Sequence, residues 1–331
     1  MNPNPRKPSR RRAANLAPEM LETRSLLTGG AGNTFAVMSQ TIVDQGGSVA
    51  VPFTIAPDRF TSPKGKLVVG IDVVAQKSNN VEPVVVSVAD AAGRNLRPVS
   101  RAIYTQKARR TRANDGPATT AVLVDLPALK PGATAPAAYT AKVAANNNTN
   151  GNFLIGFYLP GDADGNGKVD KADTALTRSL NGAKADSARY NYEADANRDG
   201  KINRSDLQVV RRNQGASTTI SPTVTAVLDP ASDVGAPDRV TNLSVVRFTG
   251  AASPGATLTF AEVANKVAPT IVVAGADGTY TADVPLANGS NTFRVTSVDA
   301  FGQAISGSLS PVVFNVNPTP IISGVSTAAT V

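Results

Sequence analysis

The sequence predicts a mainly β, multidomain protein in which two antiparallel β-sandwiches flank a small α-helical module, preceded by a disordered N-terminal tail. Short segments of alternating apolar and polar residues recur on both sides of the middle of the chain, with turn residues between them. Two short helical patterns lie within residues 161–215. These changes of pattern along the chain divide the 331 residues into a tail (1–30), a first sandwich (31–160), the module (161–215) and a second sandwich (216–331).

The tail is rich in Pro and Arg and carries six cations against two carboxylates, a composition that resists folding. No run of seven or more apolar residues follows its basic stretch, so an ordinary secretory signal is not predicted. Residues 17–27 nevertheless resemble the LEPR-XLL motif of planctomycete surface and exported proteins. The matching residues are Leu21, Glu22, Arg24, Leu26 and Leu27, with Thr23 in place of the proline. The resemblance implies export, although one amphipathic helical turn would have the same spacing.

Residues 31–160 predict the first sandwich. Period-two segments with frequent turns and no long helical pattern favour antiparallel sheets. The predicted strands cover residues 49–55, 67–73, 84–88, 122–126, 139–143 and 153–159. Carboxylates in this region are scattered at strand ends and turns, so no active site is predicted. The last strand runs directly into Pro160-Gly161 and the module, which predicts that the sandwich and the module pack together.

Two copies of one loop pattern, 33 residues apart, occupy the module. Each has an oxygen-bearing side chain at loop positions 1, 3, 5, 9 and 12 and Gly at position 6, which is the spacing of an EF-hand calcium loop. Calcium prefers oxygen ligands, and the main-chain carbonyl of position 7 would add one more. A solvated Asp/Gly-rich turn would explain one copy, but not two matched copies. The sequence therefore predicts two calcium ions, held by Asp162, Asp164, Asn166, Lys168, Asp170 and Asp173, and by Asp195, Asn197, Asp199, Lys201, Asn203 and Asp206.

One short helical pattern follows each loop, over residues 171–180 and 204–213, and a glycine follows each pattern as a stop signal. No amphipathic helix enters the first loop, because residues 151–160 have the pattern of a strand. Val169 and Ile202 both occupy loop position 8. Their positions predict a pairing across the two loops that would join both units in one small core.

This duplicated loop-and-helix pattern, with the linker Tyr190–Asp195 leading into the second loop, resembles a type I dockerin over residues 161–215. The resemblance implies calcium-dependent folding and docking onto a cohesin-like β-sandwich of a protein partner. It departs at loop positions 10 and 11, where cellulosomal dockerins usually carry a hydroxyl pair for the cohesin contact. This chain has Lys171-Ala172 and Arg204-Ser205 there. Calcium binding tolerates that change, but the identity of the partner is left open.

Residues 216–331 predict the second sandwich. The strand-like runs cover residues 223–228, 243–248, 256–263, 270–274, 279–286, 290–299 and 309–316. Asp277-Gly278 predicts a tight hairpin. Turn segments such as Ala276–Tyr280 and Asp299–Gly302 resemble the bacterial Ig-like repeats of large adhesins and surface-layer proteins. In some of those repeats an Asp-rich first loop binds calcium, which here would involve Asp229, Asp233 and Asp238; the alternative is that these residues cap local turns.

Composition excludes several kinds of site. The chain has no Cys and no His, so disulfides, thiolate nucleophiles, N/S-type zinc sites and Ser-His-Asp triads cannot form. Aromatic residues make up 5% of the chain and Trp is absent, which disfavours a carbohydrate-binding platform. The net charge of +8 is concentrated in the tail and in a cluster from Arg101 to Arg112, without interleaved aromatics, which disfavours nucleic-acid binding.

Three functions compete on these grounds. The first is a non-catalytic, exported calcium-binding protein that serves in cell-surface scaffolding or adhesion through dockerin-like docking. The second is an accessory component of a polysaccharide-degrading, cellulosome-like system, with a surface polysaccharide as a partner. The third is a binder of nucleic acid or another acidic polymer through the basic clusters. The first is favoured, with an extracellular or cell-surface location, no enzymatic activity and no membrane-spanning segment, because no run approaches the roughly 18 apolar residues that cross a bilayer.

Overall fold

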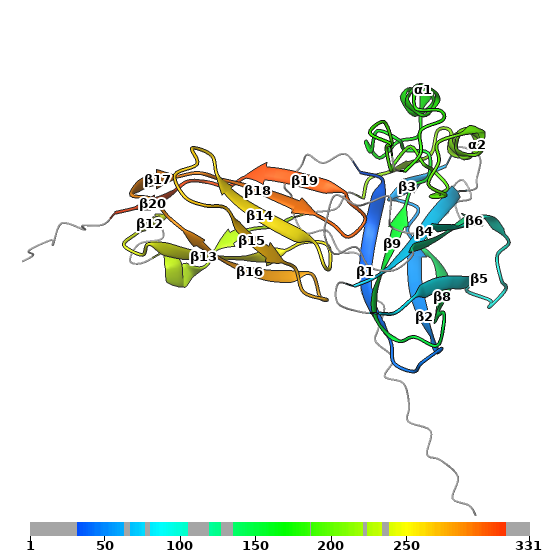
Figure 1. The fold of residues 1–331 in the computed structure, drawn as a ribbon, viewed down its shortest axis with the longest axis horizontal. Helices are drawn as coiled ribbons and strands as arrows, with labels where there is room; N and C mark the ends of the chain where they lie inside the picture. The colour runs from blue at the N-terminus through cyan, green and yellow to red at the C-terminus, as the bar shows by residue number, and fades with distance from the viewer. Residues whose placement is uncertain are drawn as a thin grey trace, which may run out of the picture.

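The structure is a computed structural model that describes residues 32–62, 67–76, 80–104, 119–126, 135–185, 187–220, 224–233 and 238–315. The predicted tail with its LEPR-XLL-like segment, and Lys107 to Arg112 of the basic cluster, lie outside the described residues. The described part is mainly β, and its two α-helices come between two groups of strands in chain order, which confirms the predicted fold class. In space the helices lie beside the first group of sheets (Figure 1). No helix among these residues has the length and apolar character that a membrane crossing requires.

Two sheets face each other in the first sandwich, with strand orders β1-β9-β4-β7-β6 and β2-β8-β5, and all strand pairs within them are antiparallel. Strands β1 and β6 were not predicted. The outer strand β1 buries residues irregularly along its length and so lacks a clear period-two signal. The bounds are β1 Thr34–Ile42, β2 Ser48–Ile55, β4 Leu67–Ala75, β5 Pro83–Asp90, β6 Pro98–Tyr104, β7 Thr119–Leu126, β8 Ala137–Ala145 and β9 Gly151–Tyr158.

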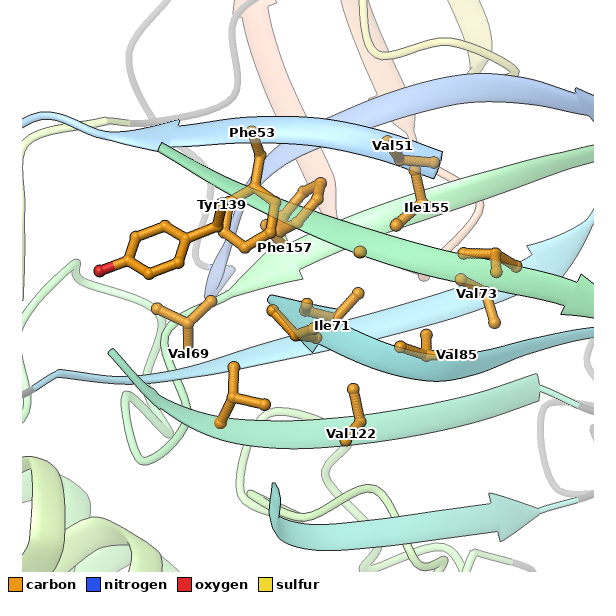
Figure 2. Packing of buried hydrophobic residues seen from close by; sticks show 14 of the residues in the cluster. Val51, Phe53, Val69, Ile71, Val73, Val85, Val122, Tyr139, Ile155 and Phe157 are labelled. Atoms are coloured by element: carbon orange, nitrogen blue, oxygen red, sulfur yellow. The ribbon is translucent and has the colours of Figure 1, made fainter. Parts of the chain in front are cut away.

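Apolar side chains from the inner faces of both sheets form the core of the first sandwich (Figure 2). On β2, alternation places Val51, Phe53 and Ile55 inside and the residues between them outside. The Phe53 ring stacks on Tyr139 of the same sheet at 5.4 Å between centroids and meets Phe157 of the opposite sheet at 4.7 Å. Burial of this apolar surface is the main stabilising contribution to the sandwich.

The central strands β4 and β9 are buried on their outer faces as well. Every residue of β4 is buried, as are the last six of β9. Two glycines make room for aromatic rings on that face: a Cβ on Gly70 would lie 2.1 Å from the Tyr158 ring, and one on Gly156 would lie 2.6 Å from Phe301. Because Phe301 comes from the second sandwich, other parts of the chain cover this outer face.

The module lies against the first sandwich (Figure 1). It contains α1 (Lys171–Ser179) and α2 (Arg204–Asn213), which agree closely with the predicted helices. Val169 and Val210 of the module, and Ala216 directly after it, belong to the same buried cluster as the sandwich core. After α2 the chain forms β10 (Ser217–Thr218), which pairs with β3 (Phe60–Thr61) of the first sandwich. The predicted packing of module on sandwich is therefore observed, and the two share one core.

Asn213, the last residue of α2, joins the module to the edge of β4. It is 2% exposed; its side-chain amide donates to the carbonyls of Val68 (2.9 Å) and Pro160 (2.8 Å), and its oxygen accepts from the Val68 N–H (2.9 Å). We expect Asn213→Ala to lower the free energy of unfolding by about 2–4 kcal/mol, because it leaves buried polar groups without partners. Urea unfolding of the calcium-saturated chain measures this. The exposed Gln208→Ala on the same helix is the control, and equal effects of both substitutions would contradict the expectation.

The second sandwich has the sheet orders β15-β14-β18-β19, β11-β13-β16 and β12-β20-β17. Its buried cluster is separate from the first core and includes Phe248, Phe260 and Phe293. The bounds are β11 Val227–Leu228, β12 Val240–Thr241, β13 Val245–Ala251, β14 Thr257–Glu262, β15 Thr270–Val273, β16 Thr279–Pro285, β17 Gly289–Asn291, β18 Phe293–Val298, β19 Ala304–Ser308 and β20 Val312–Phe314, with a 3₁₀ turn at Pro230–Ser232.

Two expectations for this sandwich were wrong in detail. The single strand predicted over residues 290–299 is divided into β17 and β18, which pair in different sheets. The buried Asn291 holds this crossing, because its amide donates to the carbonyls of Ala287 and Gly289 at 2.8 Å. Asp277-Gly278 does form a turn, with Gly278 at φ +80°, but β15 and β16 on either side of it also pair in different sheets. The turn therefore connects the sheets and does not close a hairpin.

Candidate metal centre

The two loops of the module repeat one hydrogen-bond scaffold. Asp162 at position 1 of the first loop accepts from the N–H groups of positions 5 and 6 at 3.0 and 2.9 Å, and Asp195 in the second loop accepts from the same positions at 3.1 and 2.7 Å. Asp173 at position 12 accepts from positions 2, 3 and 9 at 2.7, 3.2 and 2.7 Å. Asp206 accepts from positions 3 and 9 at 3.2 and 2.8 Å. Both loops are thus closed by the carboxylates at their two ends.

The side chains between the two ends of each loop also accept the same backbone hydrogen bonds in both loops. Position 3 accepts from the N–H of position 5 at 3.1 Å in both loops, and position 5 accepts from that of position 7 at 2.8 and 3.0 Å. Position 9, Asp170 or Asn203, caps the helix that follows by accepting from position 11 at 2.6 or 2.8 Å. At position 6, Gly167 and Gly200 have φ of +81° and +83°, a conformation that glycine adopts without strain. The oxygen side chains predicted from the spacing thus turn back into their own loop.

Carboxyl oxygens of Asp162, Asp164 and Asp173 come within 4.8 Å of one another in the first loop. Asp162 and Asp173 are fully buried, as are Asp195 and Asp206 of the second loop. The ion pairs among the described residues involve other carboxylates, namely Asp58, Asp90, Asp125 and Asp283. Each loop therefore concentrates negative charge away from water, and none of these ion pairs offsets it. In the second loop the charge of the buried Arg198 opposes the rise in the pKa of Asp195.

Burial raises the pKa of Asp162 to about 7, and the neighbouring charges of Asp173 and Asp164 add to the rise, while N–H donors such as that of Gly167 oppose it. The pKa of Asp173 is raised for the same principal reason. In the second loop, burial raises the pKa of both Asp195 and Asp206, and for Asp206 the charge of Asp195 contributes next. Oxygen donors that are buried and mutually repelling fit a hard cation such as Ca²⁺.

The loops are paired differently from the expectation that Val169 contacts Ile202. The Val169 N–H donates to Ala216 O at 2.8 Å, and Val169 O accepts from the Gly215 N–H at 2.8 Å. Ile202 makes the equivalent pair of bonds with the residues that follow α1, donating to Ala183 and accepting from Gly182, each at 2.8 Å. Each loop is therefore joined to the segment after the other helix, and Val169 and Ile202 lie in separate buried clusters.

Arg198, at position 4 of the second loop, was missed by the sequence reasoning. Its side chain is fully buried, with the guanidinium carbon 4.3 Å from the Tyr158 ring centroid and 3.5 Å from that of Tyr192. Its Nη2 donates to Asn33 Oδ1 at 2.8 Å, and its Nη1 donates to the carbonyl of Tyr192. Position 4 of the loop pattern carries no ligand, so no local signal distinguished this arginine from a solvated one.

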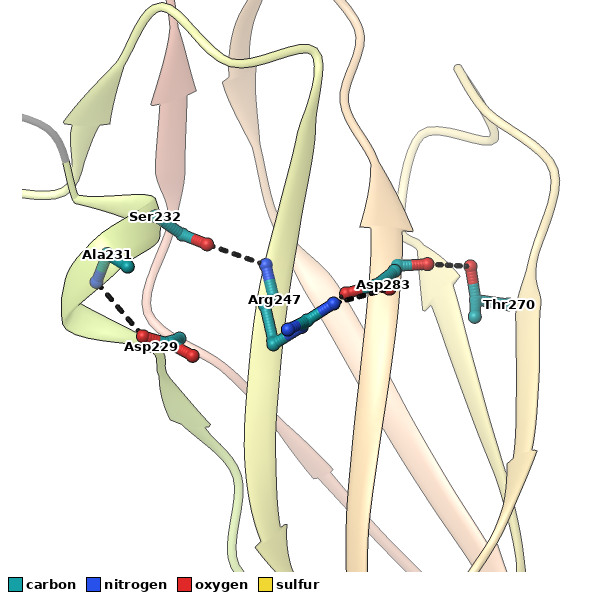
Figure 3. Close-up of polar contacts among 6 residues, drawn as sticks. All are labelled: Asp229, Ala231, Ser232, Arg247, Thr270 and Asp283. Carbon is teal, nitrogen blue, oxygen red and sulfur yellow. Dashed lines mark hydrogen bonds and ion pairs between the residues drawn. The ribbon is translucent and has the colours of Figure 1, made fainter.

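The second sandwich carries an open depression of about 280 Å³ beside the 3₁₀ turn. Figure 3 shows the polar contacts of the residues around it. Its charged side chains are already engaged: Arg247 Nε lies 2.7 Å from Asp283 Oδ1, and Asp229 accepts from the Ala231 N–H at 2.9 Å. The nearby Asp233 and Asp238 also accept from backbone N–H groups at 2.9 Å. These contacts are what the turn-capping alternative expects of the Asp-rich first loop.

Comparison with known proteins finds one family model that matches a segment of this chain. Residues 160–213 match the family model of the dockerin type I domain. No curated protein matches the sequence. A bacterial immunoglobulin-like domain from the M. primoryensis ice-binding adhesin is similar at 24% identity over 29% of this chain and 98% of that chain, with a TM-score of 0.20.

Two larger solved structures are similar over about half of their own length. A tetra-tandem repeat from the extending region of a large adhesion protein shares 12% identity over 85% of this chain and 50% of that chain, with a TM-score of 0.24. A Ca²⁺-stabilized adhesin of an Antarctic bacterium shares 14% identity over 88% of this chain and 50% of that chain, with a TM-score of 0.21. The dockerin type I match thus includes both loops and both helices, as the resemblance in the sequence predicted.

Proposed function

We propose that this chain is a non-catalytic, calcium-binding modular protein that acts outside the cell in surface scaffolding or adhesion and docks to a protein partner through residues 160–213. The observation that carries the proposal is the matched pair of loops. Each loop buries two carboxylates of like charge, and neither of them takes part in an ion pair among the described residues. Dockerin type I domains, the family that this segment matches, bind calcium and generally bind cohesin partner proteins.

Each loop would hold one calcium ion through the side chains at positions 1, 3, 5, 9 and 12 and the main-chain carbonyl at position 7. Bound calcium would supply positive charge that offsets the repulsion between buried carboxylates. The protein's own contribution is the scaffold of N–H donors that aims Asp162 and Asp173, or Asp195 and Asp206, into the same loop. Because the loops enclose the N-caps of α1 and α2, binding free energy becomes folding free energy for the module.

We expect Asp162→Ala to abolish or strongly weaken calcium binding in the first loop and to leave the second loop able to bind. Asp162 is the buried position-1 residue of its own loop, and among the described residues no hydrogen bond joins its side chain to the second loop. Calorimetric titration of the metal-free full chain should then show two sites in the wild type and one in the variant. Asp58→Ala, an exposed carboxylate in the first sandwich, is the control. Absence of calcium binding by the wild type would contradict the proposed function.

The two helices differ in what they offer a partner. On α2, Val209, Val210 and Asn213 are buried against the first sandwich. On α1 the buried residues are Asp173 and Thr177, so no apolar side chain of this helix is fully buried. Both helices expose cations, Lys171 and Arg178 on α1 and Arg204, Arg211 and Arg212 on α2. The difference in burial supports α1 as the docking face. The basic side chains there favour a partner with an acidic surface, and Lys171-Ala172 in place of the usual hydroxyl pair supports a partner that differs from cellulosomal cohesins.

A further inference from the structure

Three parts of the chain meet at one place on the outer face of β4 and β9, which we call the junction. It is formed by Asn33 in the segment that enters β1, Tyr158 at the end of β9, Tyr192 and Arg198 of the module, and Phe301 of the second sandwich. Residues of both sandwiches and of the second calcium-type loop are therefore in contact within one cluster.

Arg198 is the central residue of the junction. Its charge is fully buried, and a buried charge is stable only where polar groups or aromatic faces compensate for lost water. The compensating groups come from separate elements: the ring of Tyr158, the ring and carbonyl of Tyr192, and the amide oxygen of Asn33. The guanidinium can satisfy all of them only when the second loop holds Arg198 at this point.

Tyr192 continues the contact toward the second sandwich. Its hydroxyl donates to Asp72 on β4, and its ring packs against a buried cluster of Val74, Leu154 and Phe301. The ring that lies against Arg198 is thus the same ring that packs against this cluster. A displacement of Arg198 would remove the support on one side of that ring.

Phe301 reaches the junction on a rigid turn between β18 and β19. Asp299 Oδ1 accepts from the N–H groups of Phe301 (2.9 Å) and Gln303 (2.8 Å), and Gly302 has φ +85°. The ring is 2% exposed and fits over Gly156, because a Cβ on Gly156 would lie only 2.6 Å from the nearest ring atom. This side chain fills a recess of the first sandwich from the second. Gln303 of the same turn is buried beside Gly32, so the turn fixes one end of the second sandwich.

The position of Arg198 depends on the fold of the second loop. Its backbone has φ +58°, which is unfavourable for a non-glycine residue, and its N–H donates to Asp195 O at 3.1 Å. Asp195 is the same residue whose carboxylate closes the loop. We propose that the second loop is a cation-controlled latch: with calcium bound it holds Arg198 in the junction and fixes the orientation of the second sandwich relative to the first. The proposal rests on the proposed calcium binding and adds a mechanical role for one loop.

The first loop lacks an equivalent connection. Its position 4 is Gly165, whose carbonyl accepts one hydrogen bond, at 3.2 Å, from the Gly32 N–H. It inserts no side chain at that position, and its position-8 residue packs in the core of the first sandwich. The two loops should therefore differ: loss of the ion from the second loop should free the second sandwich, and loss from the first should not.

The chain has no cysteine, so a pair of spin labels can be introduced without background. We would label the full chain through Thr54→Cys on β2 and Thr281→Cys on β16, both exposed, and measure the distance distribution by double electron–electron resonance. With calcium chloride in excess we expect a single narrow distance, and with EDTA we expect loss of that narrow peak. Calorimetry on the same labelled protein records how many ions bind.

Variants separate the latch from general unfolding. In excess calcium, Asp195→Ala should lose the narrow peak and Asp162→Ala should keep it. Arg198→Met and Phe301→Ala should each lose the narrow peak, while calorimetry still reports two bound ions. The control is Arg178→Met, at an exposed arginine of α1, which should keep both the narrow peak and the two bound ions.

The outcomes also separate the latch from calcium binding itself. A narrow peak that persists in EDTA, in a chain shown to bind two ions, would overturn the latch and leave the proposed function standing. Equal loss of the peak in Asp162→Ala and Asp195→Ala would overturn the assignment to the second loop. A chain that binds no calcium would overturn both proposals together.

Discussion

Removal of calcium is expected to lower the unfolding temperature of the first sandwich together with that of the module, by about 10–20 °C. The reason is the shared core: Val169 and Val210 of the module, and Ala216 directly after it, lie in the same buried cluster as the inner faces of β4 and β9. Metal-free loops leave buried carboxylates repelling one another beneath the helices. If the loops open, those three residues lose their positions and the sandwich loses part of its core.

The size of the effect follows from mass action. A ligand present at about a hundred times its dissociation constant stabilises the folded state by roughly 2.7 kcal/mol per site, so two sites give roughly 5 kcal/mol. For a unit of about 150–250 residues each kcal/mol corresponds to roughly 2–4 °C. The module and first sandwich together fall in that size range, whereas the second sandwich has its own core and should respond much less.

Differential scanning calorimetry of the full chain in calcium and in EDTA measures the shift, with circular dichroism at the helix band to follow α1 and α2. The double variant Asp162→Ala/Asp195→Ala should unfold at the same temperature in calcium and in EDTA, because neither loop retains its position-1 ligand. Loss of the helix signal alone, with the sandwich transition unmoved, would contradict a shared folding unit. The full chain is needed because a module cut from the chain would expose Val169, Val210 and the buried Arg198.

The loops and helices could be predicted from the sequence because their signals are local. The spacing of oxygen side chains fixes which residues turn inward, and the glycines after each helix, Gly182 and Gly215, have φ of +85° and +86° as a stop requires. Helix α2 has the predicted bounds, and α1 ends one residue earlier than predicted. The dockerin type I match depends on the same local pattern.

The contacts between parts of the chain could not be predicted in this way. Alternation on β4 and β9 predicts one buried face of each strand. Their second faces are buried because Val209, Tyr192 and Phe301 arrive from other parts of the chain. Arg198 has the sequence context of an exposed loop residue. The pairing of Val169 with Ala216 instead of Ile202 depends on how the two halves of the module cross, which spacing along the chain does not encode.

The metal-free protein should become more stable to unfolding as the pH falls from 8 to 5. The pKa of Asp162 is about 7 in the folded state against an ordinary value of 3.8, so between about pH 4 and pH 7 the folded chain holds a proton that the unfolded chain has released. The stabilising effect of that proton is complete below pH 4 and is lost as pH rises through 7. At roughly 1.4 kcal/mol per pKa unit, Asp162 alone makes the metal-free protein about 4 kcal/mol less stable at pH 8 than at pH 4. Asp173, Asp195 and Asp206 are shifted in the same direction.

Denaturant unfolding of calcium-depleted protein at pH 5 and pH 8 tests this, and the free energy of unfolding should be higher at pH 5. In excess calcium the order should reverse, because calcium competes with protons for the same carboxylates and binds more tightly at pH 8. Asp162→Asn gives the sharpest comparison. It removes the titrating charge while keeping the side-chain shape, so it should stabilise the metal-free protein at pH 8 and weaken calcium binding in the first loop. A metal-free protein whose stability is flat or rises from pH 5 to pH 8 would show that these carboxylates are not held in the buried, mutually repelling arrangement on which calcium binding depends.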